Sequence, residues 1–199
     1  MPDDDPDADL MLRFRAGDED AFAELVRRFQ GRVVSLAARY VGSAADAEDV
    51  AQEVFLRIHR ARSTYEPTAR LTTWVHRITV NTSLNALRRR RVRRNVSAEM
   101  PGRDAGSGEP PEFADADAAR PDEESLKVEL AQVLRRIVDA LPERQRTALL
   151  LNKYQGLSYE DTAAAMELSL PAVKSLLTRA RVNVRDALLP YLESGTPPA

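Results

Sequence analysis

The sequence predicts an all-α protein: two small helical domains joined by a flexible acidic linker, with a helix-turn-helix in the C-terminal domain. Apolar residues recur at three- and four-residue steps through most of the 199 residues, which is the spacing of amphipathic helices. No segment shows the alternation typical of β-strands. Residues 95–124 are rich in Gly, Pro, Asp and Glu and almost lack large apolar side chains, which indicates the linker.

Composition excludes several functional classes. The chain has no cysteine, so disulfides, thiolate metal sites and cysteine nucleophiles are excluded. Its only histidines, His59 and His76, lack a plausible set of partners for catalysis or metal binding. We therefore expect no enzyme activity, no metal and no cofactor. The N-terminus does not resemble a signal peptide, and no apolar run approaches the ~20 residues of a membrane span. We expect a cytoplasmic protein without membrane insertion.

The N-terminal domain is expected over residues 10–94, after a disordered acidic tail at 1–9. Asp18 can cap a first long helix that Gly42 ends, with an apolar face at Phe22, Leu25, Val26, Phe29, Val33, Leu36, Ala37 and Tyr40. Ser43 and Asp46 resemble a capping box that starts the next helix, whose inward residues are Ala47, Val54 and Ile58. A polar break at 62–70 precedes a helix from about Thr72, with apolar residues Leu71, Trp74, Val75, Ile78, Leu84 and Leu87.

The C-terminal domain is expected over residues 125–192, before a short tail at 193–199. A helix runs from Ser125 to Leu141, Pro142 starts the next helix in its first turn, and Gly156 ends it. Residues 158–181 then have the pattern of a helix-turn-helix. The small Ala163 lies where two helices meet, and the buried residues are expected to be Met166, Leu168, Val173, Leu176 and Ala180.

The helix-turn-helix has two interpretations: an ordinary three-helix packing unit, or a DNA reader whose second helix enters the major groove. Cationic side chains that stay outside the predicted core favour DNA. The candidate DNA-binding residues on this helix are Ala172, Lys174, Ser175, Thr178, Arg179 and Arg181.

The helix that starts near Asp46 carries an acidic face formed by Asp46, Asp49, Gln52 and Glu53. Carboxylates near a helix N-terminus are favoured by the helix dipole, so this face is either simply solvated or a docking surface for a basic protein partner.

A third group of residues combines aromatic, amide and cationic side chains: Tyr65, Trp74, Asn81, Asn85, Arg88 and Arg89. Arginines neutralise phosphates, amides bond base edges and aromatic rings stack on unpaired bases. The set suits single-stranded or melted DNA. The alternative makes Trp74 a core residue and the arginines a solvated helix end, although six arginines within residues 88–94 repel one another unless an anion is present.

Taken together and in order, these motifs resemble those of bacterial RNA polymerase sigma factors of the small, two-domain, extracytoplasmic-function group. The matching segments are 46–55 (Asp-Ala-Glu-Asp-Val-Ala-Gln-Glu-Val-Phe), 73–81 (Thr-Trp-Val-His-Arg-Ile-Thr-Val-Asn), 141–146, 173–175 and 179–181. The sequence departs from the family at Glu167, at Pro171-Ala172 and at Leu176, where the family often has Gly, Gly-Thr and Arg.

The resemblance implies a role for each part. Residues 10–94 would dock through the acidic helix on the clamp helices of core RNA polymerase and would capture and melt the minus-ten promoter element. Residues 125–192 would read the minus-thirty-five element, and the linker would set the spacing of the two readers. An anti-sigma factor is a further expected partner. The competing interpretation is a helix-turn-helix regulator that is not a polymerase subunit, but residues 1–94 lack a ligand-binding or phosphoacceptor pattern.

Overall fold

The computed structural model describes residues 5–98 and 121–194, with side chains over 5–92 and 128–193. Its described part is helical throughout and contains no strand, so the all-α prediction is confirmed. The chain divides into two compact units, Met1–Glu112 and Phe113–Ala199, which we call the N-terminal and C-terminal units. Within residues 5–98 and 121–194, no helix combines the length and the apolar character needed to cross a membrane.

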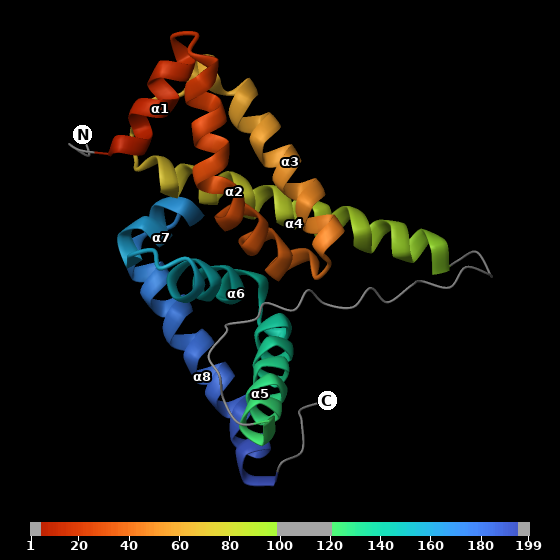
Figure 1. Cartoon of the computed structure of the whole chain (residues 1–199). Coiled ribbons are helices and arrows are strands. Elements are labelled where there is room, and N and C mark those ends of the chain that lie inside the picture. The colour runs from red at the N-terminus through yellow and green to blue at the C-terminus, as the bar shows by residue number, and fades with distance from the viewer. Residues whose placement is uncertain (1–4, 99–120, 195–199) are drawn as a thin grey trace. The chain divides into compact units, whose positions relative to one another are not determined.

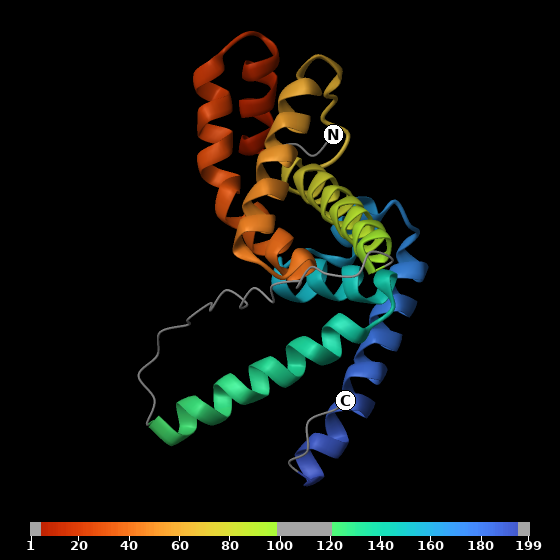
Figure 2. The same ribbon diagram turned by 90° about the vertical axis from the view of Figure 1, so that its right-hand side faces the viewer.

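The N-terminal unit contains four helices: α1 (Pro6–Arg15), α2 (Glu19–Val41), α3 (Ala44–Arg60) and α4 (Leu71–Ala98). Helices α1, α2 and α3 lie side by side, α4 crosses them, and its C-terminal end extends beyond the others (Figures 1 and 2). The predicted helix ends are confirmed: Asp18 and Ser43 cap α2 and α3, and Gly42 ends α2 at a φ of 82°, a conformation that favours glycine.

The predicted disorder of residues 1–9 is wrong for residues 6–9, which form the start of α1, while residues 1–4 lie outside the described part. Asp5 caps this helix, and its buried side chains are Ala8, Leu10, Met11 and Phe14. The acidic composition of the segment concealed this short apolar pattern. The linker predicted at 95–124 falls mostly outside the described residues. Its ends, 95–98 and 121–124, are helical, as are residues 193 and 194 of the predicted tail.

Helix α4 buries two of the predicted apolar residues, Leu71 and Val75, but the rest of its buried face differs from the prediction. The predicted apolar residues Trp74, Ile78, Leu84 and Leu87 are only half-buried, whereas the buried face includes His76, Thr79, Val80, Thr82 and Ser83. Two of these hydroxyls bond backbone carbonyls one turn back: Thr79 Oγ1 donates to Val75 at 2.9 Å and Thr82 Oγ1 to Ile78 at 2.8 Å. Such local bonds satisfy a buried hydroxyl within its own helix, so polar residues can occupy a core position that the hydrophobic pattern does not reveal.

The C-terminal unit contains α5 (Pro121–Ala140), α6 (Glu143–Leu149), a π-helical turn (Leu150–Tyr154), α7 (Tyr159–Met166) and α8 (Leu170–Ser194). Helix α8 packs against α5, α6 and α7. Pro142 precedes the first turn of α6 as its N-cap, one position earlier than predicted. The side chains of Leu149, Leu150 and Leu151 are buried in this unit.

Helices α7 and α8 form the predicted helix-turn-helix around a core of small side chains, Ala148, Ala163, Val173 and Leu177. Met166, Leu168 and Leu176, expected in the core, are only partly buried against this cluster. Leu177 takes the inner position at 1% exposure. The turn between the helices places Glu167 in the left-handed region with φ of 54°. Side chains are strained there, whereas glycine is not.

We expect Glu167→Gly to raise the free energy of unfolding of the C-terminal unit by about 0.5–1 kcal/mol, because glycine removes the steric cost of the left-handed conformation. Urea denaturation monitored by circular dichroism measures this change. Glu160→Gly, which replaces an exposed residue inside α7, is the matched control and should be destabilising. A lower stability for Glu167→Gly would contradict the expectation.

Candidate functional site

One face of α4 collects the residues predicted to meet DNA. Trp74, Asn81, Asn85 and Arg88 follow one another at intervals of seven, four and three residues and so lie along one side of the helix, opposite the buried His76. Trp74 is half-buried and the other three are exposed. Arg88 Nη1 lies 3.4 Å from Asn85 Oδ1, and the neighbouring Arg89 is also exposed. The face thus presents one aromatic ring, two amides and a cationic end.

Tyr65 is not placed to contact DNA, which corrects that part of the prediction. Its side chain is only 3% exposed, and its ring meets Trp74 edge-on with centroids 5.1 Å apart. Burial, followed by the charge of Asp5, raises the pKa of Tyr65 to about 12. Arg15 Nη1 donates to the Tyr65 carbonyl at 3.0 Å, and the buried hydroxyl has no hydrogen-bond partner among the residues that the structure describes. The Tyr65 ring is therefore a buried packing partner of the Trp74 ring.

The four residues of the predicted acidic face divide between two grooves, with the three carboxylates in one and Gln52 in the other. Asp46, Asp49 and Glu53 line a groove of about 650 Å³ against α4, whose own lining includes Arg88, Arg89 and Arg90. Gln52 lines a different groove, because it lies about 100° around the helix from Glu53. The prediction of a single face is wrong for Gln52. Asp46, Asp49, Gln52 and Glu53 lie along the part of α3 between the two grooves, which we call the α3 ridge.

Asp46 is already paired within the unit. Its Oδ2 accepts a hydrogen bond from Arg90 Nη1 at 3.0 Å, and the same Arg90 nitrogen donates to the carbonyl of Val41 at 3.0 Å. Arg90 thus joins α4 to the end of α2 and the first turn of α3. Glu53 accepts from Arg57 Nε at 2.8 Å on the same helix.

The second groove lies between α2 and α3 and was not predicted. It encloses about 980 Å³, and its apolar lining includes Phe22, Val26, Val34, Phe55 and Leu56. Leu56 is 50% exposed, and the polar rim includes Arg27, Glu48 and Gln52. An apolar groove with a polar rim suits the side of a helix from a protein partner. The signal in the sequence was the adjacent pair Phe55-Leu56, two large apolar residues outside the buried face of α3.

In the C-terminal unit, α8 carries all six predicted DNA-binding residues in its first half. Lys174, Thr178, Arg179 and Arg181 are exposed, and Ala172 and Ser175 are half-buried. Arg181 Nη2 donates to the hydroxyl of Tyr159 at 2.7 Å, which holds this arginine beside α7. The buried Val173, Leu177 and Ala180 form the inner side of α8, and Arg181 lies at the edge of that side, about 40° around the helix from Leu177. The arrangement leaves the first turns of α8 open to a DNA groove.

The described residues contain no group of three His, Asp or Glu side chains that could hold a metal ion. His76 is buried in α4, and the His59 ring packs against Phe14 and Phe22 at 5.2 and 5.3 Å. Both histidines therefore have packing roles.

Comparisons with known proteins agree with this division into two units. Residues 25–93 match the family model for sigma-70 region 2, and residues 131–184 match that for sigma-70 region 4. The chain is 37% identical to the RNA polymerase sigma-H factor of Pseudomonas aeruginosa over 191 residues, which cover 94% of this chain and 95% of that protein. It is also 37% identical to the ECF RNA polymerase sigma-E factor of Escherichia coli K12 over 185 residues, 92% and 94% of the two chains.

Two solved structures share the fold. CnrH in complex with the cytosolic domain of CnrY has a TM-score of 0.65 at 24% identity, covering 92% of this chain and 96% of that one. The sigma factor RpoE in complex with the anti-sigma factor NepR from Bartonella quintana has a TM-score of 0.61 at 21% identity, covering 83% and 94%.

A helix-turn-helix in one unit and an aromatic, arginine-rich helix in the other define a DNA-binding protein of the transcription machinery. The chain belongs to the sigma-70 family of RNA polymerase sigma factors, in the extracytoplasmic-function (ECF) group. It is accordingly a factor that directs RNA polymerase to promoters, a non-catalytic role in transcription initiation.

We expect Tyr65→Phe to raise the free energy of unfolding of the N-terminal unit by about 1 kcal/mol, because it removes a buried hydroxyl without a partner and keeps the ring. Tyr65→Ala, which removes the ring, should lower it by about 3 kcal/mol. Urea denaturation followed by Trp74 fluorescence measures both. Marked destabilisation by Tyr65→Phe would show that the hydroxyl is satisfied in solution.

Proposed function

We propose that the N-terminal unit docks on core RNA polymerase through the ridge of α3 and meets the minus-ten promoter element through α4, while α8 reads the minus-thirty-five element. The observation that carries this proposal is the separation of surfaces in the N-terminal unit. The acidic ridge and the apolar groove beside it suit a protein partner. The outward face of α4 suits DNA. The linker over residues 95–124 would then set the spacing between the two readers.

Polymerase docking on α3 would use both grooves. Asp49 and Glu53 offer carboxylates to basic side chains on one side of the ridge, and Gln52 offers an amide on the other. The half-exposed Leu56 supplies apolar area between them. Asp46 would contribute through its pair with Arg90, which fixes α3 against α4. A helix of the partner lying along this ridge satisfies both the charge and the shape of the grooves.

Promoter opening would use the outward face of α4. Trp74 provides a ring for stacking on an unpaired base, Asn81 and Asn85 provide amides for base edges, and Arg88 and Arg89 neutralise phosphates. The contact with the buried Tyr65 ring limits the movement of the Trp74 ring. Because Trp74, Asn81, Asn85 and Arg88 follow one face of a continuous helix, a single strand can pass along them in order, with Arg89 beside its end.

An anti-sigma factor is a further proposed partner, since one solved structure with this fold, RpoE from Bartonella quintana, is by its title a complex with the anti-sigma factor NepR. We also place the protein in the cytoplasm, where RNA polymerase works. A helix-turn-helix regulator that acts without polymerase is less favoured, because the N-terminal unit itself matches a sigma region.

Reversing two charges on the ridge tests polymerase docking. Asp49→Arg with Glu53→Arg should weaken binding to core RNA polymerase by about tenfold or more, because two attractive contacts become repulsive. Fluorescence anisotropy with labelled protein measures the affinity, and circular dichroism checks that the helices remain. Asp9→Arg with Asp20→Arg makes the same charge change at exposed positions of α1 and α2 and should bind normally. Equal affinities for the two double variants would exclude α3 as the docking helix.

Substitutions in α8 separate base reading from phosphate contact. Lys174→Ala with Ser175→Ala should change the preferred upstream promoter element, since a base contact contributes roughly 1–3 kcal/mol of discrimination. Arg181→Ala should mainly lower affinity and its salt dependence for all sequences alike. Selection from a promoter library with each variant holoenzyme gives the preference. An unchanged upstream motif for the double variant would show that these two positions do not read bases.

A further inference from the structure

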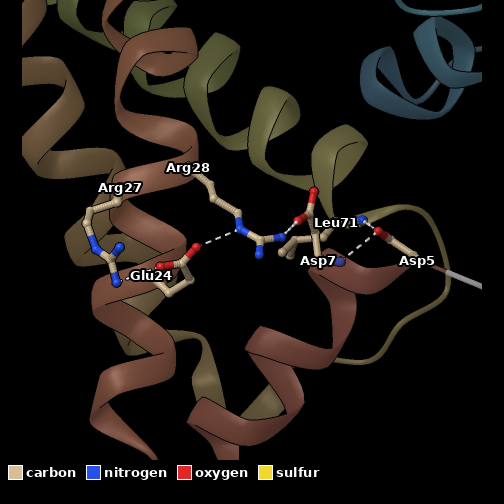
Figure 3. A network of polar contacts seen from close by, with 6 residues as sticks. All are labelled: Asp5, Asp7, Glu24, Arg27, Arg28 and Leu71. Carbon is tan, nitrogen blue, oxygen red and sulfur yellow. Dashed lines mark hydrogen bonds and ion pairs between the residues drawn. The ribbon is translucent and has the colours of Figure 1, made fainter.

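The residue before α1 reaches the start of α4, which lies 66 positions later in the chain. One oxygen of Asp5, Oδ1, accepts a hydrogen bond from the backbone N–H of Asp7 at 3.2 Å and so caps α1. The other oxygen, Oδ2, accepts from the N–H of Leu71, the first residue of α4, at 2.7 Å. Figure 3 shows the Asp5 carboxylate between these two helix starts. A single side chain thus satisfies unpaired donors of two helices.

Charged contacts hold this segment in place. Asp7 accepts from Arg28 Nη1 of α2 at 2.7 Å, and Glu24 accepts from Arg28 Nε at 2.9 Å. Arg27 pairs with the same glutamate within α2. The Asp7–Arg28 pair therefore ties the start of α1 to one side of α2 (Figure 3). The carbonyl of Asp5 also accepts from Ala8 N–H at 3.0 Å. The Asp5 carboxylate is therefore carried by an ordered backbone.

Both ends of α1 are hydrogen-bonded to the stretch of chain from Tyr65 to Leu71, which leads into α4. At its C-terminal end, Arg15 donates to the Tyr65 carbonyl, and at its N-terminal end Asp5 bonds Leu71. Trp74 lies three residues, just under one turn, after Leu71 and rests on the Tyr65 ring. The Leu71 side chain is fully buried, so the first turn of α4 is fixed by packing from one side and by Asp5 at its end. The charge of Asp5 also contributes to the raised pKa of Tyr65, consistent with their closeness.

We propose that Asp5 is a positioning residue for promoter opening: by capping α4 from a distant part of the chain, it fixes the first helical turn and with it the orientation of Trp74 toward DNA. This inference rests on the proposed function of Trp74. Asp5 itself does not contact DNA in this scheme. Its effect passes through the Leu71 N–H to the helix that carries Trp74.

Asp5→Asn tests the positioning directly, because an amide has one acceptor oxygen and cannot cap both helices. Hydrogen exchange of the Leu71 amide should become about tenfold faster, which corresponds to the loss of one charge-assisted hydrogen bond. Trp74 is the only tryptophan, so a change in its emission and in its quenching by acrylamide reports its surroundings without interference. Asp9→Asn removes the same charge from an exposed position in the first turn of α1 and should leave both readouts unchanged. Equal Leu71 exchange in the two variants overturns the inference.

A second variant separates positioning from a general loosening of α1. Asp7→Asn breaks the pair with Arg28 but retains the Asp5 carboxylate. It should lower stability without the specific change at Leu71 and Trp74. If Asp7→Asn reproduces the Leu71 exchange and the Trp74 signal of Asp5→Asn, the effect is one of stability and the inference is wrong.

Permanganate footprinting with intact holoenzyme on a cognate promoter connects the geometry to function. Asp5→Asn should slow strand opening about fivefold to tenfold with normal closed-complex formation, and Trp74→Ala should show the same defect more strongly. Normal opening with Trp74→Ala refutes the proposed function of Trp74, while the exchange measurement still decides whether Asp5 caps α4. A defect in Trp74→Ala with normal opening in Asp5→Asn overturns the inference alone.

Discussion

Helix α4 buries one side against the rest of the N-terminal unit and leaves the other side, the proposed DNA-binding face, exposed to solvent. This division determines which residues the exposed face presents. The buried side is largely polar. It is accommodated because the hydroxyls of Thr79 and Thr82 are satisfied by carbonyls of their own helix. Larger apolar side chains such as Ile78 and Leu84 are thereby left half-exposed beside the amides. In a helix with a continuous apolar stripe, Ile78 and Leu84 would point inward. The face that starts at Trp74 would then not be exposed.

The sequence was sufficient for features that depend on local chemistry. Helix ends follow from single side chains such as Asp18 and Ser43, and the helix-turn-helix follows from small residues at a fixed spacing. It was not sufficient for contacts between distant segments. The Asp5–Leu71 bond, the burial of Tyr65 and the separation of Gln52 from Glu53 all depend on how the helices pack. The buried hydroxyls of α4 were missed because hydrophobic periodicity does not register a polar residue that is satisfied locally.

Arg90 connects the surface assigned to polymerase with the surface assigned to DNA. One guanidinium nitrogen bonds both the carbonyl that ends α2 and the carboxylate of Asp46 in the first turn of α3. The pair is partly exposed, so its contribution to stability is modest, but its geometry fixes α4 where the helix leaves the bundle. The cationic end of α4 therefore contains at least one arginine that serves the fold, and a count of positive charges overestimates the number that can meet phosphate.

The core of the helix-turn-helix is built from side chains that are almost all small, with Ala148, Ala163 and Val173 bringing three helices close together. The outward surface of α8 takes little part in this packing. Ser175, Thr178 and Arg179 can therefore change without altering the interior. If α8 reads the promoter as proposed, a domain of this kind can acquire a new promoter preference while its folding requirements stay the same. Sequence preference and stability then depend on separate sets of residues and can evolve independently.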